Sequence, residues 1–204
     1  MIQFHIYYQY KIINGGFNVG KFNFIRTEIR DLYIIEPQIF GDSRGYFIEC
    51  YNKKDFCNAG LTMEFVQDNE SKSKKGVLRG LHFQMSHPQG KLVRVTEGSV
   101  FDVAVDLRIG SPTFSKYVSI ILTAKNKKQF YIPEGFAHGF LVLSETATFN
   151  YKCTDYYTPE YENGILWSDE DLSIPWPIEE IKEILLSDKD KKQKRLRDIK
   201  ISIL

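Results

Sequence analysis

The chain has 204 residues, of which 43% are hydrophobic and 14% aromatic, which suffices for one sizeable core and leaves too little length for two typical domains. Its 27 basic and 26 acidic side chains nearly cancel, which argues against a partner bound through a global field, such as nucleic acid or an anionic membrane surface. No stretch approaches the ~20 apolar residues that cross a bilayer, and the first ten residues lack the pattern of a secretion signal. We therefore expect a soluble, cytoplasmic protein.

The number and spacing of the cysteines are consistent with a cytoplasmic protein. Cys50, Cys57 and Cys153 are three in number and lack the CxxC spacing of zinc and redox motifs. They support neither a disulfide framework nor a thiolate metal site, as is usual in a reducing cytoplasm.

The chain begins with residues 1–21, which contain three glycines and no clear period, so we treat them as an N-terminal extension. From Phe22 to Lys152, short β-prone runs alternate with Gly, Pro, Asn and charged breaks, a spacing typical of antiparallel sandwiches and barrels. The clearest runs cover residues 32–36, 46–51, 91–96, 100–107, 117–122, 138–143 and 146–153. No helical segment between them is long enough for the crossovers of a parallel sheet.

The run 100–107 alternates most regularly, with Phe101 and Val103 on one face and Asp102 and Asp106 on the other. This alternation predicts a half-buried strand with one core face and one polar face. An all-β fold follows, with its main domain over residues 22–178.

Two helical segments are expected outside the strands. A short helix is predicted over residues 53–60, ending at Gly60. A C-terminal helical segment, packed on the barrel, is predicted within residues 179–204, because Ile181, Ile184 and Leu185 recur at helical spacing in a charged run.

His138 lies in a Pro-x-Gly-x-x-His pattern, in which Pro and Gly form a turn that delivers the histidine onto the next strand. The pattern resembles the second motif of cupins, jelly-roll β-barrels whose first motif supplies further His and Glu ligands to a metal. At the positions of a second His and of the Glu, this chain has Gln84 and Lys91. An ammonium group there repels a cation, so the resemblance implies a cupin-like antiparallel barrel with no metal site and no cofactor.

Longer blocks make the resemblance specific. They cover residues 65–71, 76–84, 89–95, 110–114, 132–140, 151–157 and 164–167. In order and number these blocks are similar to the signature of dTDP-4-dehydrorhamnose 3,5-epimerases, over roughly residues 24–190. The resemblance implies conversion of dTDP-4-dehydro-6-deoxy-D-glucose to dTDP-4-dehydro-L-rhamnose, in dTDP-L-rhamnose biosynthesis.

That reaction inverts C3 and C5, which flank a ketone, so the enzyme needs a base, an oxyanion stabiliser and an acid. The resemblance assigns His82 as the base, and an imidazole with an ordinary pKa of ~6.5 suits that task near neutral pH. It assigns Asp190 as the carboxylate that orients His82 and Tyr151 as the proton donor on the opposite face. Lys91 would place positive charge beside the enolate oxygen.

The resemblance also assigns substrate contacts, mostly to the nucleotide. These residues are Arg44, Glu49, Gln67, Asn69, Arg79, His138, Glu162 and Lys189. Arginine forks suit a diphosphate. Strict strand alternation would place Arg79 and His82 on opposite faces, unless Gly80 lies at a bulge or bend.

Other functions stay open. Relatives that epimerise C3 or C5 alone share most of these residues. A non-catalytic cupin that binds a nucleotide sugar needs neither His82 nor Tyr151, and considered alone each of these would more often be a structural residue. A metal-dependent cupin oxygenase or isomerase is disfavoured by Lys91. A homodimer is expected, because members of the family commonly form one.

Overall fold

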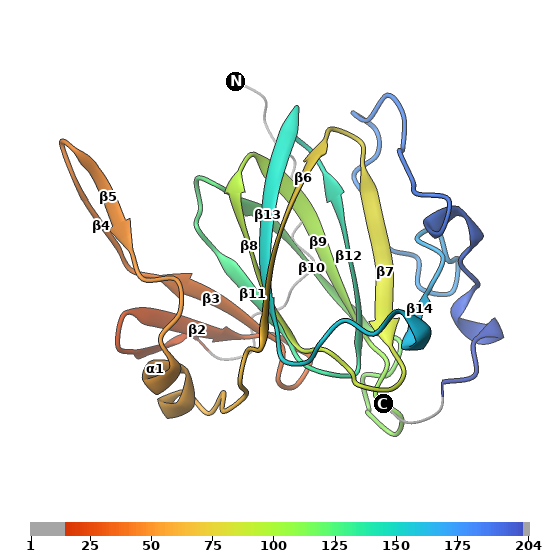
Figure 1. Cartoon of the computed structure of the whole chain (residues 1–204), viewed down its shortest axis with the longest axis horizontal. Coiled ribbons are helices and arrows are strands. Elements are labelled where there is room, and N and C mark those ends of the chain that lie inside the picture. Colours follow the sequence, from red (N-terminus) through yellow and green to blue (C-terminus); the bar gives the residue numbers. More distant parts are fainter. Residues whose placement is uncertain (1–14, 202–204) are drawn as a thin grey trace.

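The structure is a computed structural model that describes residues 15–201. Within these residues two antiparallel sheets face each other, and one short α-helix, α1 (Lys53–Asn58), lies at one end of the molecule (Figure 1). The predicted all-β fold and the predicted short helix are both confirmed. The helix begins where the Asn52 side chain accepts hydrogen bonds from the backbone N–H groups of Lys54 and Asp55.

The larger sheet has seven strands in the order β1-β2-β3-β11-β8-β13-β6. Their bounds are β1 (Phe17–Val19), β2 (Phe22–Arg26), β3 (Tyr33–Pro37), β11 (Gln129–Ile132), β8 (Lys91–Glu97), β13 (Thr146–Cys153) and β6 (Gln67–Lys74). β1 falls inside the predicted extension 1–21, so regular structure begins earlier than expected. Residues 1–14 of that extension lie outside the described residues, as do residues 202–204.

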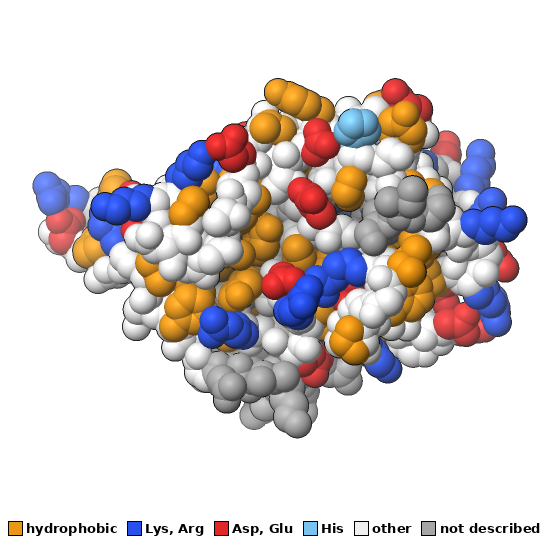
Figure 2. Space-filling model, turned by 90° about the horizontal axis from the view of Figure 1, so that it is seen from below, with side chains coloured by type: hydrophobic (Ala, Val, Ile, Leu, Met, Phe, Trp, Pro, Cys, Tyr) orange, Lys and Arg blue, Asp and Glu red, His pale blue; other side chains and the backbone are white. Residues whose placement is uncertain are grey.

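The smaller sheet has five strands in the order β10-β9-β12-β7-β14. Their bounds are β10 (Tyr117–Thr123), β9 (Ser99–Asp106), β12 (Phe136–Val142), β7 (Leu78–Gln84) and β14 (Glu162–Gly164). A separate hairpin of β4 (Ile39–Asp42) and β5 (Gly45–Ile48) projects away from the two sheets (Figure 1). Acidic and basic side chains are mixed over the surface seen in Figure 2, as the balanced composition leads one to expect.

The main core fills the space between the sheets. Val93 and Val95 of β8 and Phe149 of β13 meet Phe140 and Val142 of β12, and all five are at most 5% exposed. Each such side chain contributes roughly 1.5–3 kcal/mol by leaving water. The period-2 pattern of these strands therefore points one face of each sheet inward.

β9 corrects one expectation. Every residue from Val100 to Asp106 is buried, so the strand has no solvent-exposed polar face. Phe101 packs with Trp176 of the C-terminal segment, which covers the outer face of the smaller sheet. Asp102 is fully buried on the opposite face, which it shares with Ala104 of the main core. The polar face predicted for this strand is in fact its interior face.

The predicted C-terminal helix is wrong. Within residues 179–201 only two single turns of 3-10 helix form, η2 (Asp190–Lys192) and η3 (Leu196–Asp198). The backbone N–H of Leu185 donates to the carbonyl of Gly76 at 2.8 Å, and Leu78 N–H donates to the carbonyl of Leu185 at 3.1 Å. These bonds hold Leu185 beside the start of β7, so its N–H and C=O groups are not available for helical hydrogen bonds.

The described part of the chain contains no helix of the length and apolarity that crossing a membrane requires.

Candidate active site

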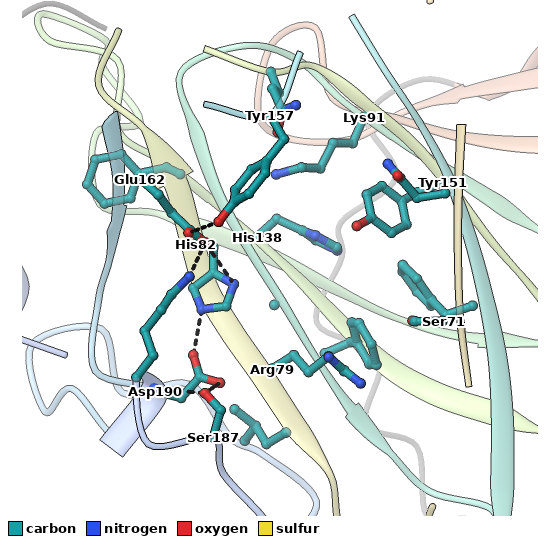
Figure 3. Close-up of a pocket in the computed structure, with 18 of the residues that line it drawn as sticks. Ser71, Arg79, His82, Lys91, His138, Tyr151, Tyr157, Glu162, Ser187 and Asp190 are labelled. Atoms are coloured by element: carbon teal, nitrogen blue, oxygen red, sulfur yellow. Dashed lines mark hydrogen bonds and ion pairs between the residues drawn. The ribbon is translucent and has the colours of Figure 1, made fainter. Parts of the chain in front are cut away.

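A cavity of about 630 Å³ opens between the two sheets. Its walls are β6, β8 and β13 of the larger sheet, β7 and β12 of the smaller sheet, and the C-terminal segment around η2. Ten of the twelve predicted site residues line it, namely Gln67, Asn69, Arg79, His82, Lys91, His138, Tyr151, Glu162, Lys189 and Asp190. Figure 3 labels Arg79, His82, Lys91, His138, Tyr151, Glu162 and Asp190 among them. The fold thus brings together residues that are up to 123 positions apart in the chain, as between Gln67 and Asp190.

The other two predicted residues do not line the cavity. Arg44 lies at the turn of the β4–β5 hairpin, where its exposed guanidinium pairs with Asp42 at 2.5 Å. Glu49 follows that hairpin and pairs with Lys21 at 3.5 Å. Within this chain, neither reaches the cavity, and their substrate contacts stay a prediction.

His82 and Asp190 form a short polar contact in the cavity. Nε2 of His82 lies 2.5 Å from Oδ1 of Asp190, whose side chain is only 3% exposed. Burial would raise the pKa of Asp190, but hydrogen bonds from His82 and Ser187 outweigh it and hold the pKa below its ordinary value. An ionised carboxylate only accepts hydrogen bonds, so Nε2 of His82 donates to Asp190, and in the neutral form of the ring Nδ1 is the nitrogen that holds the lone pair.

A β-bulge explains how Arg79 and His82 reach the same cavity. His82 pairs with His138 across β7 and β12, whereas Arg79 pairs with Phe140, so two residues of β7 stand opposite one residue of β12. Gly80 lies in this bulge with a φ of +110°. A Cβ on Gly80 would lie 2.5 Å from the Cα of Gly139, so the close approach of the two strands requires glycine. The conflict between strand alternation and site assignment is thereby resolved.

Tyr151 and Lys91 belong to the larger sheet, which forms the wall of the cavity opposite β7 and His82. Tyr151 lies on β13 and Lys91 on β8, and each side chain lines the cavity (Figure 3). Burial raises the pKa of Tyr151, which keeps the phenol protonated, and burial lowers the pKa of Lys91. Neither side chain forms a hydrogen bond or ion pair with another described residue, so both polar ends stay available to a ligand.

Glu162 lies beside the free nitrogen of His82. Its Oε1 is 4.0 Å from Nδ1 of His82, and the same carboxylate pairs with Lys189. The hydroxyl of Tyr157 donates to Oε2 of Glu162 at 2.5 Å, and this bond raises the pKa of Tyr157 to about 12. Tyr157 was missed as a candidate, although it ends the block 151–157 that carried part of the resemblance.

Asp102 was also missed. Its two carboxylate oxygens each lie 3.0 Å from Nε2 of His138, and its side chain is completely buried. Burial raises the pKa of Asp102, and the neighbouring His138 and Lys91 oppose that rise. An aspartate in the middle of an apolar strand was the available signal, but alternation assigned it to solvent. The pair fixes the ring of His138, which stacks on Phe149 with centroids 6.0 Å apart.

Gln67 and Asn69 belong to a series of hydrogen bonds in which each donor and acceptor can be assigned. The backbone N–H of Tyr157 donates to Oε1 of Gln67 at 3.0 Å, and Nε2 of Gln67 donates to Oδ1 of Asn69 at 3.0 Å. Nδ2 of Asn69 then contacts Sγ of Cys153 at 3.7 Å. Because a backbone N–H only donates, it sets both amide orientations. Each amide keeps one N–H for an acceptor on a ligand.

Gln84, which stands where the first cupin motif has its second His, forms hydrogen bonds with neighbouring loops. Nε2 of Gln84 donates to the carbonyl of His87 at 2.6 Å, and its Oε1 accepts from Thr158 N–H at 2.8 Å, so the amide serves the surrounding loops. Among residues 15–201, no group of three or more His, Cys, Asp or Glu side chains is arranged to hold a metal ion.

A family model described as dTDP-4-dehydrorhamnose 3,5-epimerase matches residues 26–198. The chain belongs to the dTDP-4-dehydrorhamnose 3,5-epimerase family. A relative of that name from Methanothermobacter thermautotrophicus is 52% identical over 180 residues, which cover 88% of this chain and 97% of the relative. The family membership that the sequence blocks predicted is therefore confirmed.

Solved structures agree in fold. The Legionella pneumophila dTDP-6-deoxy-D-glucose-3,5-epimerase, in complex with dTDP-4-keto-L-rhamnose, superposes with a TM-score of 0.84 and 54% identity, covering 88% of this chain and 95% of the other. A 3'-monoepimerase, ChmJ from Streptomyces bikiniensis in complex with dTDP-quinovose, has a TM-score of 0.77 and 34% identity, covering 83% and 86%. The likeness to these epimerases confirms the cupin-like jelly roll.

Proposed function

We propose that this chain is an isomerase that converts dTDP-4-dehydro-6-deoxy-D-glucose to dTDP-4-dehydro-L-rhamnose by inverting C3 and C5, in dTDP-L-rhamnose biosynthesis. One observation carries the proposal: a histidine base with a buried carboxylate partner, His82 and Asp190, faces a partly buried tyrosine, Tyr151, across one cavity. A ligand-binding module needs neither a poised base nor an acid on the other wall.

The first step is proton removal from a carbon beside the 4-keto group. Nδ1 of His82 accepts the proton, and the electron pair of the C–H bond moves toward the carbonyl oxygen to form an enolate. Asp190 is buried and ionised, so it stabilises the imidazolium that results. The short contact between Nε2 and Oδ1 holds the ring during this transfer.

Lys91 stabilises the enolate. Its side chain lines the cavity without a hydrogen-bond partner among the described residues, so its ammonium group is available to the developing negative oxygen. Asp102 and Glu162 contribute negative charge nearby, which favours the protonated form of Lys91 against the effect of burial.

Tyr151 completes the inversion. Its phenol donates a proton to the face of the carbon opposite His82, so the new C–H bond forms with inverted configuration. The positive charge of Arg79 lowers the energy of the phenolate that is left behind, until it regains a proton from solvent. No electron leaves or enters the sugar, so the reaction needs no redox cofactor, and we propose that it also proceeds without a metal.

The nucleotide is held by the polar groups at the cavity wall. Arg79 is oriented by Ser73, whose hydroxyl oxygen lies 3.0 Å from Nη2, and its guanidinium suits a diphosphate. Gln67 and Asn69 offer amide N–H groups to carbonyl oxygens of the base or to phosphate. Lys189 of the C-terminal segment also lines the cavity and adds positive charge there.

A homodimer in the cytoplasm is part of the proposal. The projecting β4–β5 hairpin carries Tyr46 at 59% and Phe47 at 62% exposure, which is apolar surface suited to a second subunit. The same hairpin carries Arg44, which cannot reach the cavity of its own chain. Light scattering is expected to give twice the chain mass.

The competing function is epimerisation at a single carbon, as ChmJ is named to perform. The higher identity to double epimerases favours inversion of both carbons. The deciding experiment incubates the purified chain with dTDP-4-dehydro-6-deoxy-D-glucose and EDTA and assigns the product by NMR. We expect inversion at C3 and C5. Inversion at one carbon would make the chain a single epimerase, and an unchanged sugar would reject the function.

A further inference from the structure

Ser187 contacts Asp190 twice through one hydroxyl. Its Oγ donates to Oδ2 of Asp190 at 2.7 Å and accepts from the backbone N–H of Asp190 at 3.1 Å. The polarity is forced, because a backbone N–H only donates and an ionised carboxylate only accepts. The single proton of the hydroxyl is therefore committed to the carboxylate. Figure 3 shows Ser187 on the side of Asp190 away from His82.

The hydroxyl is itself held in place relative to β7, the strand that carries His82. Leu185, two residues before Ser187, exchanges backbone hydrogen bonds with Gly76 and Leu78 at the start of that strand. The carbonyl of Ser187 accepts from Lys191 N–H at 3.1 Å, which closes the turn that contains Asp190. These backbone hydrogen bonds therefore hold the side chains of His82, Asp190 and Ser187 in fixed positions relative to one another.

The carboxylate of Asp190 depends on both side-chain partners. His82 contacts Oδ1 and Ser187 contacts Oδ2, the backbone of Gly80 gives the carboxylate a weaker third hydrogen bond, and the side chain of Asp190 is only 3% exposed. A buried carboxylate oxygen that loses its donor is strongly destabilised, so the group rotates to recover a partner. Rotation would lengthen the contact between Oδ1 and Nε2 of His82, and the ring would lose the bond that selects its tautomer.

We propose that Ser187 is a positioning residue of this site: it holds Asp190 in the orientation that accepts Nε2–H of His82 and so keeps Nδ1 of His82 free and directed at the cavity. Its effect on turnover rests on the proposed function. Ser187 also borders the cavity, so a direct contact with the substrate is the competing role that the test must separate.

A double-mutant cycle separates the two roles. Ser187→Ala is expected to lower kcat by about tenfold, the scale of one hydrogen bond to a charged group, with KM unchanged. In an Asp190→Ala background the same substitution is expected to have no further effect, because Ser187 acts only through that carboxylate. Ser187→Thr, which keeps the hydroxyl, is expected to retain kcat. An equal loss of kcat in both backgrounds, or a raised KM with normal kcat, would overturn the proposal.

A second readout needs no substrate. The ¹⁵N shifts of the His82 ring, assigned by comparison with His82→Gln, are expected to report the Nε2–H tautomer in the wild-type chain and a mixture of tautomers in Ser187→Ala. If Ser187→Ala does not fold, the same measurement is made on Ser187→Cys, whose side chain is similar in size to serine but is a much weaker hydrogen-bond donor. An unchanged tautomer in a folded variant would reject the proposal. Because this measurement uses the free protein, failure of the proposed function would leave its result interpretable.

Discussion

His82 and Tyr151 lie on opposite sheets and line the same cavity from its two sides. His82 belongs to β7 of the smaller sheet, and Tyr151 belongs to β13 of the larger one. A sugar carbon bound between them can lose a proton to one wall and receive a proton from the other. The arrangement of two facing sheets therefore supplies the opposite-face geometry that inversion of a stereocentre demands.

Tyr151→Phe tests the division of labour between the two walls. The ring stays in place and only the hydroxyl is lost, so proton removal by His82 continues while donation to the opposite face fails. Inversion is expected to slow by about a hundredfold or more, whereas exchange of the sugar proton with solvent persists. NMR in D₂O follows both processes in one sample. Equal loss of exchange and inversion would contradict the assignment of Tyr151 as acid.

Lys91→Met tests the role of the buried ammonium group. Burial lowers the pKa of Lys91, so the charge is held at a cost to the folded state, and an apolar side chain of similar length is expected to raise stability by about 1 kcal/mol. Turnover is expected to fall at least a hundredfold. Thermal unfolding and kcat measure the two effects. Lys152→Met is the control, since Lys152 pairs with Asp68 on the outer face of β13, and its activity is expected to be normal. An active Lys91→Met enzyme would remove Lys91 from the mechanism.

Gly80→Ala tests the bulge that brings Arg79 to the cavity. The new Cβ would lie 2.5 Å from Gly139 Cα at a φ of +110°, so β7 and β12 must separate. Gly110→Ala is the matched control, because its φ of +79° is similarly restricted but no atom lies within 4 Å of the added Cβ. The control is expected to lose about 1 kcal/mol of stability and no activity. Gly80→Ala is expected to lose more stability and most of its activity, and similar behaviour of the two variants would refute the packing argument.

Asp106→Asn tests a buried ion pair outside the cavity. Burial would raise the pKa of Asp106, but hydrogen bonds from Arg108, Thr113 and Ser111 lower it to about 2. A lowered folded-state pKa adds stability above the unfolded-state value of ~3.9, and this stability is lost as the pH falls toward 2. Asp106→Asn is therefore expected to cost about 3 kcal/mol at pH 7 and to flatten the acid unfolding profile between these values.

Asp31→Asn supplies the control for Asp106. Asp31 contacts the same Arg108 at 3.2 Å, but its side chain is 49% exposed, so its loss is expected to cost under ~1 kcal/mol. Urea unfolding at pH 7 and at pH 3 compares the two variants. Equal losses at pH 7 would show that burial of Asp106 does not set its contribution.

The strand pattern and the sequence blocks were enough to predict the all-β fold and ten of the residues that line the cavity. Period-2 alternation failed at Asp102, because it distinguishes the two faces of a strand without showing which face another segment covers. The C-terminal segment covers the outer face of β9, so the apolar side chain of Phe101 points toward that segment and Asp102 points inward.

Helical spacing failed for a related reason. Ile181, Ile184 and Leu185 recur at helical intervals, but the backbone of Leu185 pairs with β7, and tertiary hydrogen bonds outweigh the local preference. The same pairing places Ser187 and Asp190 beside His82. No local pattern predicts such a long-range bridge, which is why Ser187 could not be found from the sequence.

The most direct test of the account is the number of solvent deuterons that the chain places in its product. In D₂O, the wild-type chain is expected to convert dTDP-4-dehydro-6-deoxy-D-glucose into a product that carries deuterium at both C3 and C5. His82→Ala is expected to bind dTDP normally and to introduce none. Deuterium at one carbon only, or exchange that persists without His82, would contradict the account.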